Sequence, residues 1–286
     1  METKELIRDF EKNFPNVDKD LFLYIPREEL DREFFYYLEA KPKCSVNSYA
    51  NKLIKYYQQD TFYAYEKSLW KDCAIKVKLL GNRMHYLGKK PNELTTNDLL
   101  TGFKKSGIHY GYSGFNPLLA KWFFERYNCK VCYDPCGGWG HRMLGAVELE
   151  KYIYNDLSYS TAKNVSLLKN DYDLFNTEIY CEDARTFMPS DKYDCMFTCP
   201  PYYNTEHYEC GDFESKDAFI EFMDLLFEKY LAKDSCKVFG LVIREDLLYS
   251  HTDFAEKIAI YNSKRTHLNE HKKYDEYLYI YKKTLN

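Results

Sequence analysis

Short β-rich runs alternate with helical segments from Gly111 onward, and this alternation restricts the fold more than any other feature of the sequence. The β-rich runs cover residues 130–135, 151–156, 178–183, 193–200 and 237–243, and amphipathic segments cover 141–150, 160–175 and 217–231. Strands that alternate with helices form βαβ units, in which the strands pair in parallel. Two more β-rich runs, 254–262 and 274–283, are joined by a polar stretch and favour an antiparallel hairpin. We therefore expect residues 111–286 to form an α/β, Rossmann-like domain with a mostly parallel sheet and a C-terminal hairpin.

Residues 1–110 have a different pattern, in which apolar residues recur near the helical period. The periodic segments are 31–40, 48–70 and 73–87, and polar or Pro-containing breaks lie at 41–43 and 89–98. This pattern predicts a helical N-terminal region in front of the α/β domain.

The charge of the chain is uneven. The formal net charge is −4, which excludes a basic nucleic-acid binder over the whole molecule. The stretch from Lys67 to Lys105, however, contains nine basic residues and only three acidic ones, and Trp70, Tyr86 and Phe103 lie among them. This stretch is either a solvated helical face or a nucleic-acid surface, and its candidate contacts are Lys76, Lys78, Arg83, Lys89 and Lys90.

The sequence also bears on location and on metals. The first ten residues carry mixed charges where a signal peptide needs an apolar stretch, and no run approaches the roughly 18 apolar residues of a membrane span. We expect a cytosolic protein with no membrane partner, in which the ten cysteines are reduced. Cys129 and Cys132 form a C-x-x-C motif with Cys136 nearby, but no second pair follows at a zinc-site spacing, so we expect no metal.

The first predicted strand of the α/β domain runs into a glycine-rich turn and then a helix. Glycine lets a backbone turn sharply and approach a ligand closely, and helix N-terminal N–H groups favour a carboxylate. The turn consists of Asp134, Pro135, Cys136, Gly137, Gly138, Trp139 and Gly140. It is a candidate cofactor loop, although any tight βα turn can use glycine.

Acidic residues also stand at the ends of the next two predicted strands. Asp156 follows Asp134 by 22 positions, close to the roughly 20-residue spacing at which an acid meets a ribose diol in dinucleotide folds. Asp183, followed by Ala184, ends the third strand and can accept a hydrogen bond from an adenine amino group. A nucleoside-containing cofactor is therefore indicated.

The fourth predicted strand ends in the most specific segment of the chain, Thr198 to Asn204. Pro200 and Pro201 fix φ and lack N–H donors, so the carbonyls of Cys199 and Pro200 are available as acceptors for an amine. The ring of Tyr202 offers a stacking surface for a planar base. An ordinary proline turn is the alternative interpretation.

With these motifs in place, residues 111–284 resemble the DNA amino-methyltransferase family, which methylates the exocyclic amines of adenine or cytosine. The resemblance makes residues 134–140 the cofactor loop, Asp156 the ribose acid and Asp183 with Ala184 the adenine contact. Residues 199–202 match the catalytic (Asp/Asn/Ser)-Pro-Pro-aromatic tetrapeptide. Residues 113–119, including Phe115 and Asn116, resemble the family's additional cofactor motif.

The implied cofactor is S-adenosyl-L-methionine, and the implied reaction is direct displacement on a base flipped out of double-stranded DNA. The base would stack on Tyr202 and donate to the Pro200 carbonyl, with Tyr203 and Asn204 as further base contacts. Cys199 departs from the family because a thiol is a poor acceptor. Three interpretations are open. The backbone carbonyls are sufficient as acceptors, or the side chain of Thr198, Asn204 or Glu206 takes the place of the missing acceptor, or the activity is weakened or altered.

Target recognition has no room inside the α/β domain, because only 58 residues separate the cofactor loop from Cys199. We expect it to fall to the N-terminal region or to a partner, either a specificity subunit or a second copy of the chain. The resemblance suits a restriction-modification enzyme of a bacterium or phage. The alternatives are an RNA-base amino-methyltransferase, a non-catalytic cofactor-binding subunit of a DNA-modification complex, and a small-molecule or protein methyltransferase.

Overall fold

The computed structural model describes residues 25–42, 49–59, 84–90, 114–203, 210–260 and 276–283, with single positions at Lys12, Gly81, Glu93, Leu94 and Asp98. The chain divides into two compact units. The first comprises Met1–Leu30 and Gln58–Ser113, and the second comprises Asp31–Tyr57 and Gly114–Asn286. The long stretch of the second unit starts close to the predicted boundary at residue 111. Residues 31–57, which the sequence pattern groups with the N-terminal region, belong to the second unit.

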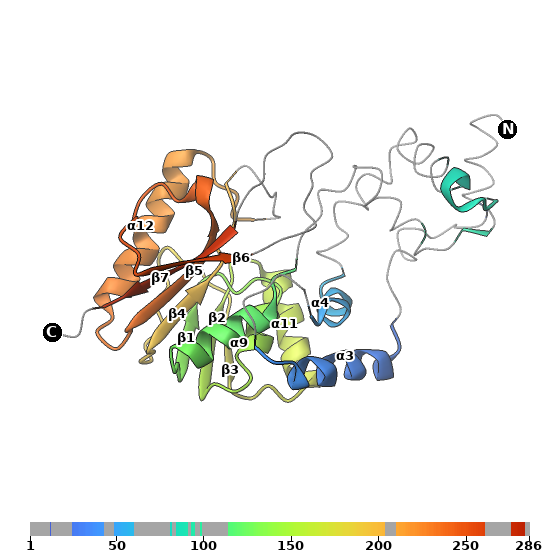
Figure 1. Ribbon diagram of the computed structural model, residues 1–286, viewed down its shortest axis with the longest axis horizontal. Coiled ribbons are helices and arrows are strands. Elements are labelled where there is room, and N and C mark those ends of the chain that lie inside the picture. The colour runs from blue at the N-terminus through green and yellow to red at the C-terminus, as the bar shows by residue number, and fades with distance from the viewer. Residues whose placement is uncertain are drawn as a thin grey trace. The chain divides into compact units, whose positions relative to one another are not determined.

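Within the described residues the second unit contains a seven-stranded sheet in the order β3-β2-β1-β4-β5-β7-β6 (Figure 1). Its strands are β1 (Val131–Asp134), β2 (Lys151–Asn155), β3 (Thr177–Tyr180), β4 (Cys195–Thr198), β5 (Val238–Arg244), β6 (Glu256–Ile260) and β7 (Glu276–Lys282). The first five pair in parallel, whereas β7 pairs antiparallel with both β5 and β6. The predicted α/β class, with a mostly parallel sheet and an antiparallel hairpin, is confirmed. The polar link 263–273 lies outside the described residues.

Burial along the strands explains their sequences. Every residue of β4 and β5 is buried, as expected for central strands covered on both faces, and both strands are predominantly apolar. The edge strand β6 alternates between partly covered and exposed residues, which fits a strand with one solvated face. The position of β7 between β5 and β6 is not predicted by the sequence, because the strand pattern gives the hairpin but not the strand beside which it pairs.

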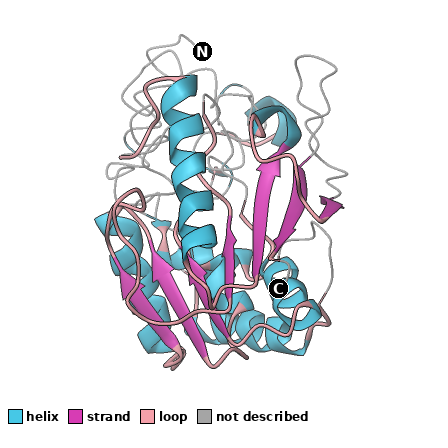
Figure 2. Cartoon of the chain, turned by 90° about the vertical axis from the view of Figure 1, so that its left-hand side faces the viewer, coloured by secondary structure: helices cyan, strands magenta, loops and turns pink. Residues whose placement is uncertain are grey.

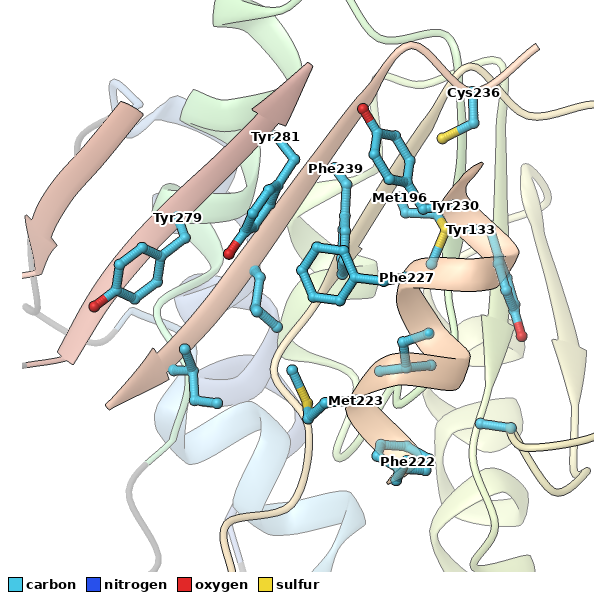
Figure 3. Close-up of a cluster of buried hydrophobic side chains, with 14 of the residues drawn as sticks. Tyr133, Met196, Phe222, Met223, Phe227, Tyr230, Cys236, Phe239, Tyr279 and Tyr281 are labelled. Carbon is cyan, nitrogen blue, oxygen red and sulfur yellow. The ribbon is translucent and has the colours of Figure 1, made fainter. Parts of the chain in front are cut away.

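Helix α12 (Lys216–Ala232) covers one face of the sheet and lies in front of it in Figure 2. The Ser215 side chain accepts a hydrogen bond from the Ala218 amide and so caps its first turn. Its apolar stripe belongs to a buried cluster shared with β1, β4, β5 and β7. Figure 3 shows Phe227 and Tyr230 of this helix beside Phe239 of β5 and Tyr281 of β7.

Helix α9 (Pro117–Arg126) packs on the opposite face, and the sequence analysis does not predict it as a helix. Proline at its first position and an Asn116 cap are favourable for a helix start. Phe123 stacks on Phe197 of β4 with ring centroids 4.5 Å apart. A Cβ added at Gly240 would lie 2.6 Å from both rings, so glycine in β5 permits this close approach.

The remaining helices are short or flank the sheet. Helix α10 (His141–Gly145) is shorter than the predicted 141–150, and α11 (Tyr159–Asp171) follows β2 as predicted. Helix α4 (Asn51–Tyr57) lies in the predicted helical segment 48–70, and α3 (Arg27–Glu39) overlaps the predicted segment 31–40 but begins four residues before it. The 3-10 helix η2 (Glu245–Leu247) follows β5. No helix among the described residues is long and apolar enough to cross a membrane.

Residues 31–57 are tied to the α/β core by specific hydrogen bonds. The buried Tyr37 hydroxyl donates to the Leu144 carbonyl at 2.8 Å. The Tyr57 hydroxyl donates to Asp171 at 2.5 Å, and the Tyr172 hydroxyl donates to Asp31 at 3.0 Å. These contacts explain why this stretch belongs to the second unit.

Candidate active site at the carboxyl ends of β1 and β4

The winding of the sheet reverses between β1 and β4. From β1 the chain proceeds through β2 to β3 on one side, and it then returns to β4 and β5 on the other. In open α/β sheets, ligands bind outside the carboxyl ends of the strands at such a switch point. The two most specific predicted segments, residues 134–140 and 198–202, follow these two strands. The topology therefore brings the two segments together.

Asp134 joins these segments through a fully buried carboxylate. Its Oδ2 accepts from Arg142 Nε at 2.6 Å and from the Tyr152 hydroxyl at 2.5 Å. Its Oδ1 accepts from the Thr198 hydroxyl at 2.8 Å and from the Cys136 amide at 3.2 Å. A carboxylate has about four acceptor positions, so these donors fill it. The Asp134 carboxylate thus links the candidate cofactor loop, residues 134–140, to the end of β4.

The glycine turn is closely packed against β2. The Gly137 amide donates to the Asn155 carbonyl at 2.6 Å, and a Cβ at Gly137 would lie 2.1 Å from the Tyr154 ring. Gly138 and Gly140 have φ of 60° and 93°, in the left-handed region that favours glycine. Pro135 is buried, and Cys136 and Trp139 are partly buried. Each glycine therefore has a steric or conformational reason to be there.

Asp156 stands beside this turn, as the spacing predicts. Its Oδ2 accepts from the Gly138 amide at 2.8 Å, and its Oδ1 accepts from the Ser158 amide at 2.9 Å. Burial raises the pKa of this carboxyl group, while these two amide hydrogen bonds oppose the rise. Each oxygen keeps acceptor capacity, because each takes one hydrogen bond here. A diol could therefore bind to Asp156 without displacing the turn.

Two residues that organise the site are missing from the sequence interpretation. Buried Asn155 donates from Nδ2 to the carbonyls of Pro135 and Glu182, at 3.1 and 2.9 Å, and thereby links the ends of three strands. Buried Arg142 pairs with Asp134, donates to the Cys136 carbonyl and lies 5.1 Å from the centre of the Phe115 ring. The sequence offers only weak signals for these two residues. Asn155 comes directly before the strand-end acid Asp156, and Arg142 is a basic residue at the start of a helix.

The third strand end is more open. Asp183 is partly exposed and forms an ion pair with Arg185 at 2.6 Å, and hydrogen bonding to this guanidinium lowers the pKa of the carboxyl group. Ala184 is buried and joins the core cluster. An adenine contact at Asp183 stays a prediction, and a ligand there would share the carboxylate with Arg185.

The segment before α9 reaches the same site. Phe115 packs edge-on against Phe197, with ring centroids 5.9 Å apart, and faces Arg142. Asn116 is buried, and its side chain accepts from the Leu118 amide at 3.1 Å. In the structure, Phe115 thus borders the Asp134 network, whereas Asn116 caps the helix.

The predicted catalytic tetrapeptide leaves β4 directly after Thr198. Pro200 is buried and Pro201 is partly buried. The Cys199 thiol lies 3.6 Å from the Tyr202 hydroxyl, which donates to Glu276 Oε1 at 3.4 Å. The Tyr202 ring is 7% exposed and belongs to the core cluster, and Tyr203 is half-buried beside Phe219. Glu276, at the start of β7, is a third residue that the sequence interpretation misses.

The predicted substrate contacts are only partly described. Asn204, Glu206, Lys76, Lys78, Arg83, Trp70 and Phe103 lie outside the described residues. In the first unit, Lys89 forms an ion pair with Asp98 at 2.9 Å, and Lys90 is exposed. The basic stretch stays a predicted nucleic-acid surface.

No protein-family model and no curated protein matches the chain. Among solved structures, TrmN from Thermus thermophilus is 17% identical with a TM-score of 0.46, over 64% of this chain and 53% of TrmN. A candidate RNA methyltransferase from Pyrococcus horikoshii is 11% identical with a TM-score of 0.40, over 59% and 84% of the two chains. A candidate methyltransferase from Streptococcus mutans, solved in complex with SAH, is 8% identical with a TM-score of 0.36, over 53% and 86%.

The match spans about half the length of TrmN. All three TM-scores are below 0.5 and all three identities are below 25%, so these likenesses carry no argument about activity or substrate. The fold class rests on the strand order and on the antiparallel β7, which together give the expected Rossmann-like α/β architecture with a mostly parallel sheet.

Proposed function

We propose that the chain is an S-adenosyl-L-methionine-dependent methyltransferase that methylates an exocyclic amine of adenine or cytosine in DNA. One observation carries this proposal: at the switch point of the sheet, the Asp134 carboxylate binds both the Cys136 amide of the glycine turn and the Thr198 hydroxyl before the Pro-Pro tetrapeptide. A cofactor loop and an amine-accepting loop on neighbouring strand ends are what group transfer to a base requires.

The residues at the rim fit an adenosine-containing cofactor. Asp156 keeps acceptor capacity on both oxygens, and ribose hydroxyls are donors. Asp183 is partly exposed at the next strand end, where an adenine amino group would donate. When bound, the cofactor supplies an electrophilic methyl group. The chain would orient it with Asp156 and the glycine turn, and Phe115 would border its methionine end.

The tetrapeptide would position the target amine. Pro200 and Pro201 make the turn rigid, the carbonyls of Cys199 and Pro200 are its acceptors, and an amine that donates to a carbonyl is aligned for attack. An amine that received the methyl group would pass one proton to solvent or to a nearby acceptor. Catalysis in this proposal is mostly a matter of position.

Glu276 supports retained activity despite Cys199. The family pattern has an oxygen acceptor where this chain has a thiol, and Glu276 brings a carboxylate to the same loop through the Tyr202 hydroxyl. We assign Glu276 the task of positioning Tyr202 and of adding negative charge beside the amine. A charged acceptor there is a stronger hydrogen-bond partner than a thiol.

Recognition of duplex DNA is assigned to the basic stretch between Lys67 and Lys105, with a specificity subunit or a second copy as a further partner. Nine basic residues within 39 positions would bind phosphates and make affinity fall steeply with salt.

The test is transfer of labelled methyl groups from the cofactor to unmodified DNA and to RNA, followed by nucleoside mass spectrometry. The expected result is methylated adenine or cytosine in DNA, which Pro200→Ala reduces at least tenfold. Pro189→Ala, at another buried proline, is the matched control and should keep activity. Label in RNA alone would replace DNA by RNA as substrate, and cofactor binding without transfer would make the chain a non-catalytic subunit.

A further inference from the structure

A cluster of thiols lies at the opposite edge of the sheet, at the amino ends of β1 and β4. The ligand atoms of Cys129, Asp194 and Cys195 all lie within 4.8 Å of one another. Cys129 precedes β1, and Cys195 opens β4 directly after Asp194. Because β1 and β4 are parallel neighbours, their amino ends meet and the three side chains converge. The site described above, at the carboxyl ends, does not use any of these residues.

A third sulfur borders this cluster. Cys132 of β1 is the register partner of Cys195 in β4, and the Cys195 thiol donates to the Val131 carbonyl of β1 at 3.7 Å. All three cysteines are buried, with Cys129 at 8% exposure closest to the surface.

Asp194 is already oriented. Its carboxylate accepts from the Lys130 amide at 3.0 Å and from the Val131 amide at 3.2 Å. Carboxylates that ligate metals are commonly fixed by such hydrogen bonds, and two oxygens with about four acceptor positions leave room for an ion. The cluster therefore combines two thiols with a pre-positioned carboxylate.

We propose that Cys129, Cys195 and Asp194 form a binding site for a thiophilic divalent cation of the zinc class, with Cys132 or a water as fourth ligand. Tetrahedral zinc with Zn–S near 2.3 Å places two thiolates about 3.8 Å apart, so a cluster whose ligand atoms lie within 4.8 Å of one another needs to contract by about 1 Å at most. Binding releases one proton from each ligating thiol, and affinity therefore rises with pH. The ion would fasten β1 to β4 at the edge opposite the active site.

Sequence spacing does not reveal this site. The C-x-x-C motif has no second pair at a zinc spacing, and the expectation of no metal rests on that absence. Cys195 is 66 positions beyond Cys129, and only the pairing of β1 with β4 brings them together. The site thus depends on strand order, which the sequence pattern leaves open.

The test is a titration of the full chain, reduced and metal-free, with Co²⁺ alone. The expected result is one equivalent bound with thiolate-to-cobalt charge-transfer and tetrahedral ligand-field bands, which Zn²⁺ bleaches. Cys129→Ala and Cys195→Ala should abolish the bands, and Asp194→Asn should weaken binding about 10- to 100-fold. Two matched controls, Cys236→Ala for a buried thiol outside the group and Cys181→Ala for an exposed one, should keep the bands.

Absence of thiolate bands in the wild-type chain, or bands that persist in Cys129→Ala and Cys195→Ala, would overturn the proposal. Circular dichroism checks that each variant folds, and Cys129 is the safer position because it lies at the rim. A second readout is the melting temperature, which Zn²⁺ should raise in the wild type and in Cys236→Ala but not in Cys129→Ala. Neither readout involves methyl transfer.

Discussion

The two ends of the β1–β4 pair use the same kind of side chain, an aspartate, for different chemistry. At each end a single aspartate accepts hydrogen bonds from the backbone of β1 or of its neighbouring turn. Asp134 is fully buried, pairs with Arg142 and has its four acceptor positions filled. Asp194 is partly exposed and lies beside the Cys129 and Cys195 thiols. A saturated carboxylate can only hold loops in place, whereas an unsaturated one beside thiols can take a cation.

The largest expected effect is at the saturated end. Asp134→Asn leaves the buried Arg142 guanidinium without its charge partner, and breaking one side of a buried ion pair costs about 3–5 kcal/mol. Asp194→Asn is the matched change at the other end and should cost less than about 1.5 kcal/mol in the metal-free chain. Urea unfolding measures both, and equal losses would contradict the difference between the two ends.

The glycine turn gives the next effect. Gly137→Ala forces the buried Tyr154 ring to move and should lower the free energy of unfolding by up to about 3 kcal/mol. The nearest neighbouring heavy atom to a Cβ at Gly138 would lie 3.7 Å away, so Gly138→Ala meets no clash. Its loss of stability comes only from the left-handed backbone conformation and is about 1–2 kcal/mol. If both variants lose the same amount by thermal or urea unfolding, the close packing of the turn on β2 is not what restricts position 137.

A smaller effect is expected where Thr198 meets Asp134. Thr198→Val keeps the shape but removes a hydroxyl that donates to a charged acceptor, which should cost about 1.5 kcal/mol. Thr186→Val is an exposed control and should change stability by less than about 0.5 kcal/mol. Thr198→Val should lower the rate of methyl transfer by more than the loss of folded protein alone explains, because the hydroxyl also positions the tetrapeptide. An unchanged rate of methyl transfer would show that the hydrogen bond from Thr198 to Asp134 is not needed for function.

The smallest effect concerns pH. Burial, together with the charges of Arg142 and Lys55, lowers the pKa of His141 to about 3, below the roughly 6.5 of the unfolded chain. The unfolded state therefore binds more protons between these values, and stability falls as the pH drops below 6.5. From pH 7 to pH 6 this group should cost about 0.7 kcal/mol. In His141→Gln that share of the slope should vanish in urea unfolding, and an unaltered slope would mean that His141 is not held neutral.

Much of the α/β unit follows from sequence because its signals are local. The strand runs, the glycine turn and the strand-end position of Asp156 are all confirmed by the structure. The sequence pattern predicts a longer α10 than the structure has. It does not predict α9, because Asn116 and Pro117 resemble part of a cofactor motif, whereas the structure shows them as a helix start. Arg142, Asn155 and Glu276 act across strands, and the pairing that places them depends on tertiary contacts rather than on spacing.

The most direct test of the central claim is calorimetric titration of S-adenosyl-L-methionine into the wild-type chain, Asp156→Asn and Asp194→Asn. We expect saturable binding to the wild type, at least tenfold weaker binding in Asp156→Asn, and unchanged binding in Asp194→Asn at the amino ends of the strands. Absence of binding to the folded wild type, or equal affinity in all three chains, would contradict a cofactor site at the carboxyl ends of β1 and β2.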